Sequence, residues 1–482
     1  MDRLVAASTQ VSQLNVAART RELSLPDMLS SLPRLQLAAD GPRDLQERQR
    51  TLAGAIAWSY DLLDPRLQAV FAALAVFAGG ADADTAVAVT GASTAELDRL
   101  VSSSLLRHSH GRYSMLETLR EFATARLDAS GAGAEARRQH ADWFLALAQE
   151  GDSVLRAGDA DGVWLDRLDA EHNNLRAALG WATEADATLA LHLAVALGHF
   201  WEWRGHSREG REHLRAVLGR DSAVEPRIRT RALMRAGVFA AMQGDLDDAL
   251  ALYEESLDMA RNAGDIALTA RAMRNLAANL RDRGDLDHAL EMHDEARLLS
   301  LQAGDRSGVA SSWVNMADVA LARGDHETAR RYAVEGVKID REIGNDVNLS
   351  GSLINLGLAC LRLDLVAEST AAYVEALELC EANRFAEGTA YGLLGVAELL
   401  ARQEEPTAAA QLLGAADAQL TAAGAVLEST EQPLRDDLEL RLANSIGDQE
   451  MRRQAAEGAA WSLASAAGAA RRLAKAIRER AS

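Results

Sequence analysis

Apolar helical segments end in helix-breaking turns at regular intervals between about residues 187 and 425. The turn residues are 39 positions apart in the first case and 40 apart in the next four: Gly205, Gly244, Gly284, Gly324, Asp364 and Glu404. A fixed period of this length is the signature of stacked structural repeats. The pattern therefore predicts pairs of antiparallel helices that recur along the chain.

Each predicted pair carries small residues at fixed places. One stands seven positions before the turn, at Gly198, Gly237, Ala277, Ala317, Gly357 and Ala397. Another stands five positions after it, at Gly210, Ala249, Ala289, Ala329, Ser369 and Ala409. Four positions further, most units carry a larger residue, as at Leu214, Tyr253, His293 and Tyr373. Small residues let two helices approach closely, and the larger side chain fills the adjacent space.

The turn chemistry supports the same arrangement. Glycine adopts a left-handed backbone at no steric cost, and a following aspartate caps the next helix. Each pair leaves an apolar face uncovered, so neighbouring pairs must stack. The pattern resembles the tetratricopeptide repeat in a long, 40-residue form, and the resemblance implies an α-solenoid.

The first part of the chain does not follow this period. Short helices are expected at about 52–63, 65–77, 83–89 and 95–105, followed by a hairpin in LLRHSHGRYSM and a helix from Glu117 to Leu127. Helices, a two-stranded wing and a further helix follow the order of a winged helix. Residues 51–130 hold six Arg, no Lys and nine acidic residues, whereas a DNA reader needs basic side chains at phosphates and base edges. Direct DNA binding is therefore not favoured.

These patterns predict an all-α chain, with a winged-helix-like domain followed by the repeat solenoid. The expected domains are a helical arm at 1–50, the winged-helix-like domain at 51–130, an irregular helical linker at 131–186, the solenoid at 187–425 and capping helices at 426–482.

Composition narrows the class of protein. Of the 482 residues, 48% are hydrophobic and only 4% aromatic, which suits an extensive helical interior. The net charge of −20 argues against a nucleic acid or an anionic membrane as the main partner. Cys360 and Cys380 have no metal-ligand spacing and are expected to be buried thiols. No apolar run is long enough for a bilayer and no signal peptide is evident, so a cytoplasmic location is expected.

Several segments carry a second resemblance, from RDLQERQRTLAGAIAWSYDLLDPRLQAVFAALAVFAGG through LDRLVSSSLLRHSHGRYSMLETLREFATARL to DAEHNNLRAALGWA. From about residue 15 to about residue 475 the chain resembles bacterial STAND-type regulators, the signal-transducing ATPases of the AfsR- or LuxR-associated type. In that family a P-loop NTPase module precedes a winged helix and a tetratricopeptide sensor. The resemblance implies a signalling or transcriptional regulator.

The chain departs from that family in three ways. No G-x-x-x-x-G-K-[ST] segment occurs, nor an acidic strand of the Walker B type, so nucleotide chemistry has no support here. Where the family carries a Met-His-Asp type motif that senses the nucleotide, this chain has Met115, Leu116 and Glu117. The helix-turn-helix that usually provides the output is also absent. The expected chain is thus a sensor and a coupling domain, without motor or effector.

Candidate binding residues lie in the first helix of each pair, which lines the inner face of such a superhelix. Asn275, Asn315 and Asn355 are spaced by one repeat and form a ladder whose amides could hold an extended peptide backbone. A cationic end suited to a carboxylate or phosphate would come from the nearby arginines Arg231, Arg235, Arg271 and Arg274. In the alternative interpretation, the asparagines bond the neighbouring repeat and fix its stacking.

Other candidates are weaker. Trp201 and Trp203 are expected in the core and cap of the solenoid, and Trp58 and Tyr60 in the core of the winged helix. His108 and His110 are expected to be solvated at the wing tip rather than to bind metal. No catalytic constellation, metal site or cofactor site is predicted.

The sequence therefore predicts a non-catalytic sensing module that binds a peptide, small effector or partner protein, with no membrane partner. Two alternatives remain: part of a regulatory ATPase that needs an NTPase module in trans, and a DNA-binding regulator acting through the winged helix.

Overall fold

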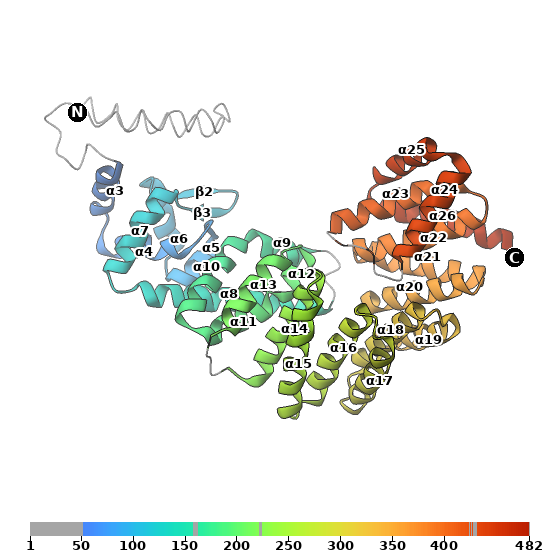
Figure 1. The fold of residues 1–482 in the computed structure, drawn as a ribbon. Coiled ribbons are helices and arrows are strands. Elements are labelled where there is room, and N and C mark those ends of the chain that lie inside the picture. The colour runs from blue at the N-terminus through green and yellow to red at the C-terminus, as the bar shows by residue number, and fades with distance from the viewer. Residues whose placement is uncertain are drawn as a thin grey trace. The chain divides into compact units, whose positions relative to one another are not determined.

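The computed structural model describes residues 52–157, 162–220, 224–423, 425, 427 and 431–481. They divide into two compact units, one ending at His140 and one beginning at Ala141 (Figure 1). The helical arm expected at residues 1–50 lies outside the described residues.

The first unit combines short helices with a small sheet. Its elements are α3 (Leu52–Asp61), α4 (Pro65–Ala73), the 3-10 turn η3 (Leu74–Val76), β1 (Ala81–Asp82), α5 (Ala83–Thr90), α6 (Thr94–Ser102), β2 (Arg107–Ser109), β3 (Arg112–Ser114), α7 (Glu117–Ala129) and the start of α8 (Gly133–Ala157). The predicted helices and hairpin lie where the sequence placed them. Strand β1 was not predicted, and it pairs with β3 to give an antiparallel sheet of order β1-β3-β2.

The core of this unit contains Phe71, Leu97 and Tyr113, all of them buried. Tyr60 packs its ring against Phe71 at 5.7 Å between centroids, as expected of a core residue. Trp58 does not, because 41% of its surface is exposed. The prediction that Trp58 belongs to the core was therefore wrong. Aromatic residues can lie on either side of a short helix whose apolar content exceeds what its buried face can hold.

The second unit begins with irregular helices and continues as a regular solenoid. The irregular part comprises the rest of α8, α9 (Val163–Ala170), α10 (His172–Ala185), α11 (Ala187–Ala196), α12 (Gly198–Trp203) and α13 (Ser207–Leu218). The solenoid comprises α14 (Pro226–Met242), α15 (Leu246–Asn262), α16 (Ile266–Asp282), α17 (Leu286–Gln302), α18 (Arg306–Ala322), α19 (His326–Ile343), α20 (Asp346–Arg362), α21 (Val366–Ala382), α22 (Ala386–Arg402) and α23 (Pro406–Ala423). It ends in α24 (Gln432–Ile446), α25 (Asp448–Ala459) and α26 (Leu463–Ala481), the closing helices that the sequence predicted.

The turns have the predicted conformation. All six turn residues have positive φ, between 58° at Asp364 and 87° at Gly284. Capping recurs every 20 residues, because the side chains of six N-cap residues each accept a hydrogen bond from the amide three positions on: Asp245, Asp265, Asp285, Asp305, Asp325 and Asn345. The 40-residue period is thus built from two similar halves, each a helix followed by a left-handed turn.

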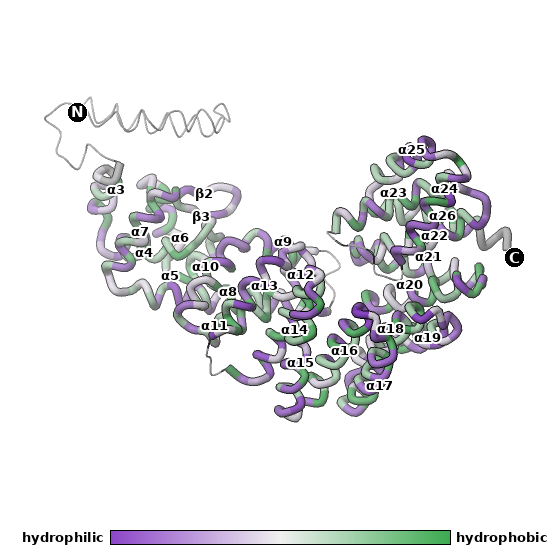
Figure 2. Tube along the Cα trace, in the orientation of Figure 1, coloured by the Kyte–Doolittle hydropathy of each residue, from purple (hydrophilic) through white to green (hydrophobic). Residues whose placement is uncertain are grey.

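The small residues have the predicted role within each pair. A methyl group at Gly357 would lie 2.9 Å from the ring of Tyr373, and one at Gly237 would lie 2.8 Å from Cδ1 of Tyr253. Hydrophobic and hydrophilic residues alternate along the solenoid helices, as expected where one side of each helix is buried (Figure 2). The fold is therefore predominantly α-helical, with a tetratricopeptide-like solenoid in the second unit.

The first helices of successive pairs also touch one another. Contacts join α14 to α16, α16 to α18, α18 to α20 and α20 to α22. Since these helices lie closer together than the second helices do, they form the concave side of the stack. We call the surface formed by α14, α16, α18, α20 and α22 the inner face.

Candidate binding surface

The predicted ladder occupies equivalent positions on the inner face, but its three asparagines differ in their contacts. Asn355 is buried, and its Nδ2 donates to Oδ1 of Asp318 at 2.6 Å and to the carbonyl oxygen of Val314 at 3.4 Å. Both acceptors belong to α18 of the preceding pair. Asn355 therefore fixes the stacking of one repeat on the next, as the alternative interpretation expected.

Arg235, at the ladder position of α14, also contacts the preceding unit. Its guanidinium donates to Nε2 of His199 at 2.9 Å and pairs with Glu202, both on α12. His199 directly follows the small residue of its unit, and Asp318 directly follows the small residue of α18. One rule therefore covers both bonds: the ladder position of one unit reaches the residue after the small residue in the preceding unit.

This rule explains why the other two asparagines have no such bond. The residues that would face Asn275 and Asn315 are Val238 and Ala278, whose side chains cannot accept or donate a hydrogen bond. Asn275 and Asn315 are half-buried, and neither side chain makes a hydrogen bond within the part of the chain that the structure describes. Two of the three predicted amides are thus without the inter-repeat hydrogen bond that Asn355 makes.

The basic end of the inner face is organised by Asp152 on α8. This buried carboxylate accepts from Nδ1 of His199 at 2.7 Å and pairs with Arg156 and, at 3.4 Å, with Arg231. Burial alone would raise the pKa of Asp152, but the bond from His199 and the two arginines hold it below its usual range. Burial lowers the pKa of His199; the hydrogen bond to Asp152 opposes this shift, and the charge of Arg235 adds to it. The imidazole donates through Nδ1 and accepts through Nε2, a tautomer assigned from its partners.

Arg271 differs from the arginines beside it. Its side chain reaches solvent, yet protein surrounds it on most sides, as happens on a concave surface. This enclosure lowers the pKa of Arg271 to about 10, and the charges of Arg235, Arg274, Arg231 and Arg156 add to the shift. Within the described residues Arg271 has no carboxylate partner. It stands one helical turn before Asn275 on α16.

Arg274 makes its hydrogen bond to α17, and not to the residues around Asp152. Its guanidinium donates to Oγ of Ser300 on α17 at 2.9 Å. Burial lowers the pKa of Arg274, and the nearby charge of Asp305 opposes the shift. Of the predicted site residues, the structure therefore brings Arg231, Arg235 and Arg271 into one group. It directs Arg274 into the α16–α17 pair.

Sequence reasoning missed four residues that organise this surface: Asp152, His199, Glu202 and Asp318. Two of them could have been found, since His199 and Asp318 occupy the same repeat position, directly after the small residue. Asp152 could not, because α8 lies outside the 40-residue register. Its role depends on how the irregular helices pack against the first regular pair.

A second concavity lies between α13, α14 and α15, with a volume of about 230 Å³. Its charges neutralise one another. Arg211 pairs with Asp245 and, at 2.7 Å, with Asp248. Asp248 also pairs with Arg215 at 3.0 Å, and Arg229 lies 3.9 Å from Glu255. This pocket therefore offers a ligand less unbalanced charge than the inner face does.

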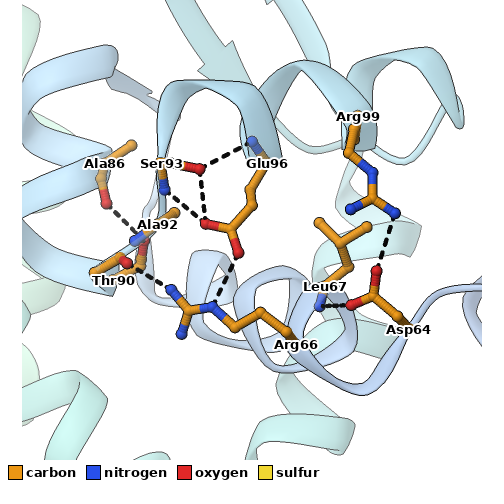
Figure 3. Close-up of polar contacts among 10 residues, drawn as sticks. Asp64, Arg66, Leu67, Ala86, Thr90, Ala92, Ser93, Glu96 and Arg99 are labelled. Atoms are coloured by element: carbon orange, nitrogen blue, oxygen red, sulfur yellow. Dashed lines mark hydrogen bonds and ion pairs between the residues drawn. The ribbon is translucent and has the colours of Figure 1, made fainter.

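The helix α6 of the first unit has its charged side chains bound within the domain (Figure 3). Arg99 pairs with Asp64 at 2.9 Å. Glu96 completes a capping box with Ser93 and pairs with Arg66 at 2.9 Å. The hydrogen bonds from Ser93, followed by those from Arg66, lower the pKa of Glu96 to about 2. In a winged helix this element would face DNA, and here it presents acids and a single, already paired arginine.

The remaining candidates differ in how deeply they are buried. Cys360 and Cys380 are buried free thiols. His108 and His110 are exposed, and His108 stacks on Tyr113 with 4.3 Å between centroids. Trp201 is buried, whereas 42% of Trp203 is exposed. Among the described residues there is no group of side chains suited to a metal ion and no helix that could cross a membrane.

Comparison with known proteins identifies the repeats. The model of the tetratricopeptide repeat family matches residues 229–297 and 268–342. Predicted HTH-type transcriptional regulators of Mycobacterium tuberculosis and Mycobacterium bovis are 34% identical over 279 residues, which cover 53% of this chain and 31% of theirs. The chain thus spans about a third of the length of these relatives.

Two solved structures are also similar to this chain, at low identity. A STAND protein of Pyrococcus horikoshii with a tetratricopeptide repeat sensor has a TM-score of 0.45 and 13% identity, covering 92% of this chain and 70% of that one. A Rap protein complexed with competence and sporulation factor has a TM-score of 0.44 and 13% identity, covering 70% of this chain and 98% of that one. The family model thus identifies tetratricopeptide repeats within residues 229–342, and the chain is similar in part to HTH-type transcriptional regulators.

Proposed function

We propose that this chain is the sensing module of a bacterial regulator and that it binds an effector or partner on the inner face of the solenoid. The observation that carries the proposal is the pair Asn275 and Asn315. Both amides are half-buried on a concave surface and lack a side-chain hydrogen bond in the part of the chain that the structure describes. Partly buried polar groups without partners weaken a fold unless a ligand or water satisfies them.

The chemistry of the two amides favours a ligand with a peptide-like backbone. Each amide offers two donors and one acceptor, and the two stand one repeat apart on adjacent helices α16 and α18. An extended peptide presents alternating carbonyl and amide groups that such a ladder can hold. Arg271, one turn from Asn275, adds a positive charge at one end of the ladder.

A sensing role also agrees with the relatives, which are predicted transcriptional regulators. In this role, ligand binding favours one arrangement of the stacked repeats over another, and the change alters contacts with a separate partner. The first unit, with its helices and three-stranded sheet, would couple the solenoid to that partner as a winged helix. We place the protein in the cytoplasm and assign it no catalytic activity.

The two alternatives have less support. Reading DNA through α6 is disfavoured, because Arg99 is paired and the helix carries Glu96 and Asp98. An ATPase role would need a nucleotide module in trans, since no P-loop occurs in the sequence. Calorimetry with ATP and ADP tests that role, and a gel shift at low salt tests DNA binding.

The main proposal is tested by selecting peptides from a random library on the full chain. The affinity of the enriched peptides is then measured for the Asn275→Ala/Asn315→Ala variant. We expect the double change to weaken binding at least tenfold, because each lost hydrogen bond in a partly buried site costs about 1 kcal/mol.

Asn262→Ala is the matched control. Asn262 is an exposed asparagine in the last turn of α15, a second helix of its pair, so its loss should leave affinity unchanged. If the selected peptides bind the double variant as tightly as the unchanged chain, with equal thermal stability, the ladder is not the binding surface.

A further inference from the structure

The basic end of the inner face carries more positive charge than its own carboxylates neutralise. Four arginines, Arg156, Arg231, Arg235 and Arg274, lie close enough to Arg271 for their charges to lower its pKa. Two carboxylates pair with members of this group: Asp152 with Arg156 and Arg231, and Glu202 with Arg235. Arg274 lies near the opposing charge of Asp305. These five arginines and three carboxylates leave an excess of two positive charges, and Arg271 has no carboxylate partner among the described residues.

Buried residues of the same unit hold several of these arginines in place. Asp152 is buried and binds His199 as well as the two arginines, and His199 in turn accepts from Arg235. Arg235 also fills the space over Gly198, where a methyl group would lie 2.6 Å from its Nε. Arg231 and Arg271 stand one repeat apart at the same position of α14 and α16, which are in contact. Arg156, Arg231 and Arg235 are thus held in place beside Arg271 without an anion.

We propose that this group is a binding site for a phosphomonoester dianion, with Arg271 as its main ligand and Arg231 and Arg235 beside it. The inference rests on the proposed function, because it assigns the chemistry of one end of the same inner face. A dianion matches the excess of two charges, whereas a single carboxylate would leave one uncompensated. Guanidinium groups bind phosphate oxygens through paired N–H donors, which makes Arg the suitable residue type.

The neighbouring polar groups fit an ester rather than a bare anion. Asn275 follows Arg271 by one turn, and Asn315 stands at the corresponding place on α18. The organic part of a small phosphomonoester would extend along these amides, while the phosphate stays among the arginines. Inorganic phosphate would occupy the arginine end alone.

The test is calorimetric titration of the full chain with four probes at pH 8: inorganic phosphate, phenyl phosphate, phenyl sulfate and benzoate. The two phenyl esters have the same shape but differ by one charge. We expect phenyl phosphate to bind at least tenfold more tightly than phenyl sulfate or benzoate, and Arg271→Gln to weaken phenyl phosphate at least tenfold. Inorganic phosphate should bind and compete with phenyl phosphate for the same site.

Arg261→Gln is the matched control, because it removes the same charge from the exposed last turn of α15, outside the group. An equal loss in both variants would mean a nonspecific effect of net charge and would overturn the proposal. The proposal would also be overturned if phenyl sulfate bound as tightly as phenyl phosphate, or if neither inorganic phosphate nor phenyl phosphate gave heat on titration. If the phosphates fail while library peptides still depend on Asn275 and Asn315, the site assignment is wrong and the sensing function stands.

Discussion

Helices α16 and α22 hold the same place in their pairs, yet one belongs to an open surface and the other to a closed core. On α16 the exposed Arg271 and the half-buried Asn275 lack hydrogen-bonding or ionic partners among the described side chains. On α22 the buried Glu398 pairs with Arg402 at 2.9 Å and with Arg441 of α24, and α26 packs against the same helix. The repeat fixes the backbone, and the side chains and the capping helices decide whether the inner face is open or covered.

The turns between the helices also differ between the two ends of the solenoid. From Asp245 to Asn345, each helix starts with a side-chain cap, and each of these six N-cap residues follows a glycine with positive φ. After that point, the N-cap residues of α21 and α22 are Leu365 and Phe385, which provide no side-chain cap, and the left-handed turn residues are Asp364, Arg384 and Glu404. Non-glycine residues there are mildly strained. Near the C-terminal end, tertiary packing compensates for weaker local signals, as its large cluster of buried residues shows.

The largest effect is expected where the cap closes the solenoid. A methyl group on Gly414 of α23 would overlap the backbone of Ala455 on α25, with Cα only 2.6 Å away. Backbone cannot move as a side chain can, so Gly414→Ala should lower the free energy of unfolding by about 3 kcal/mol. Urea denaturation followed by circular dichroism measures it. An unchanged midpoint would show that α25 does not pack closely on α23.

The second-largest effect on stability is expected from a buried histidine in α17, the helix that follows α16. His293 of α17 is buried, and neither ring nitrogen has a hydrogen-bond partner among the described residues. Burial lowers its pKa to about 3, and Arg281 and Arg274 add to the shift. In the unfolded chain the ring gains a proton below about pH 6.5, whereas in the folded chain it does not until about pH 3. The free energy of unfolding is therefore not reduced by His293 above pH 6.5, and it falls as the pH decreases below that value.

Between pH 7 and pH 4.5 the loss should reach about 2 kcal/mol. His293→Leu places at this position the residue found at the equivalent Leu214. Because other groups titrate equally in both proteins, the difference between their unfolding free energies across this pH range isolates His293. The same pH dependence in both would mean that the ring is not buried as described.

Much of this architecture could be predicted from the sequence, and the reason is local. The turn at Gly284, the cap at Asp285 and the small residue at Ala277 each act within one pair, so a register of 40 residues locates them. The split in the ladder could not be predicted from the asparagines alone, because it depends on what stands opposite, namely Val238, Ala278 and Asp318. The role of Asp152 depends on packing outside the register, which no periodic pattern reports.

The third prediction tests that split directly. Asn275 and Asn355 are ladder residues on similar helices, so replacing either by alanine gives the same gain in helix propensity. Only Asn355 loses hydrogen bonds, including the 2.6 Å bond to the carboxylate of Asp318. Asn355→Ala should therefore be less stable than Asn275→Ala by about 1.5 kcal/mol. Equal stabilities would mean that both asparagines are available to ligands and that the rule linking ladder and preceding unit fails.

The smallest effect on stability is expected at Gly351, a glycine whose surroundings differ from those of Gly414. Gly351 lies on the inner face, in the interior of α20, and a methyl group there would meet no atom within 4 Å. Alanine is a better helix former than glycine, so Gly351→Ala should raise the free energy of unfolding by about 0.5 to 1 kcal/mol. The same substitution would then have opposite signs at the two positions, measured in one series of urea titrations. If Gly351→Ala instead destabilises the chain, something packs against α20, and the inner face is not open to a ligand as far as that helix.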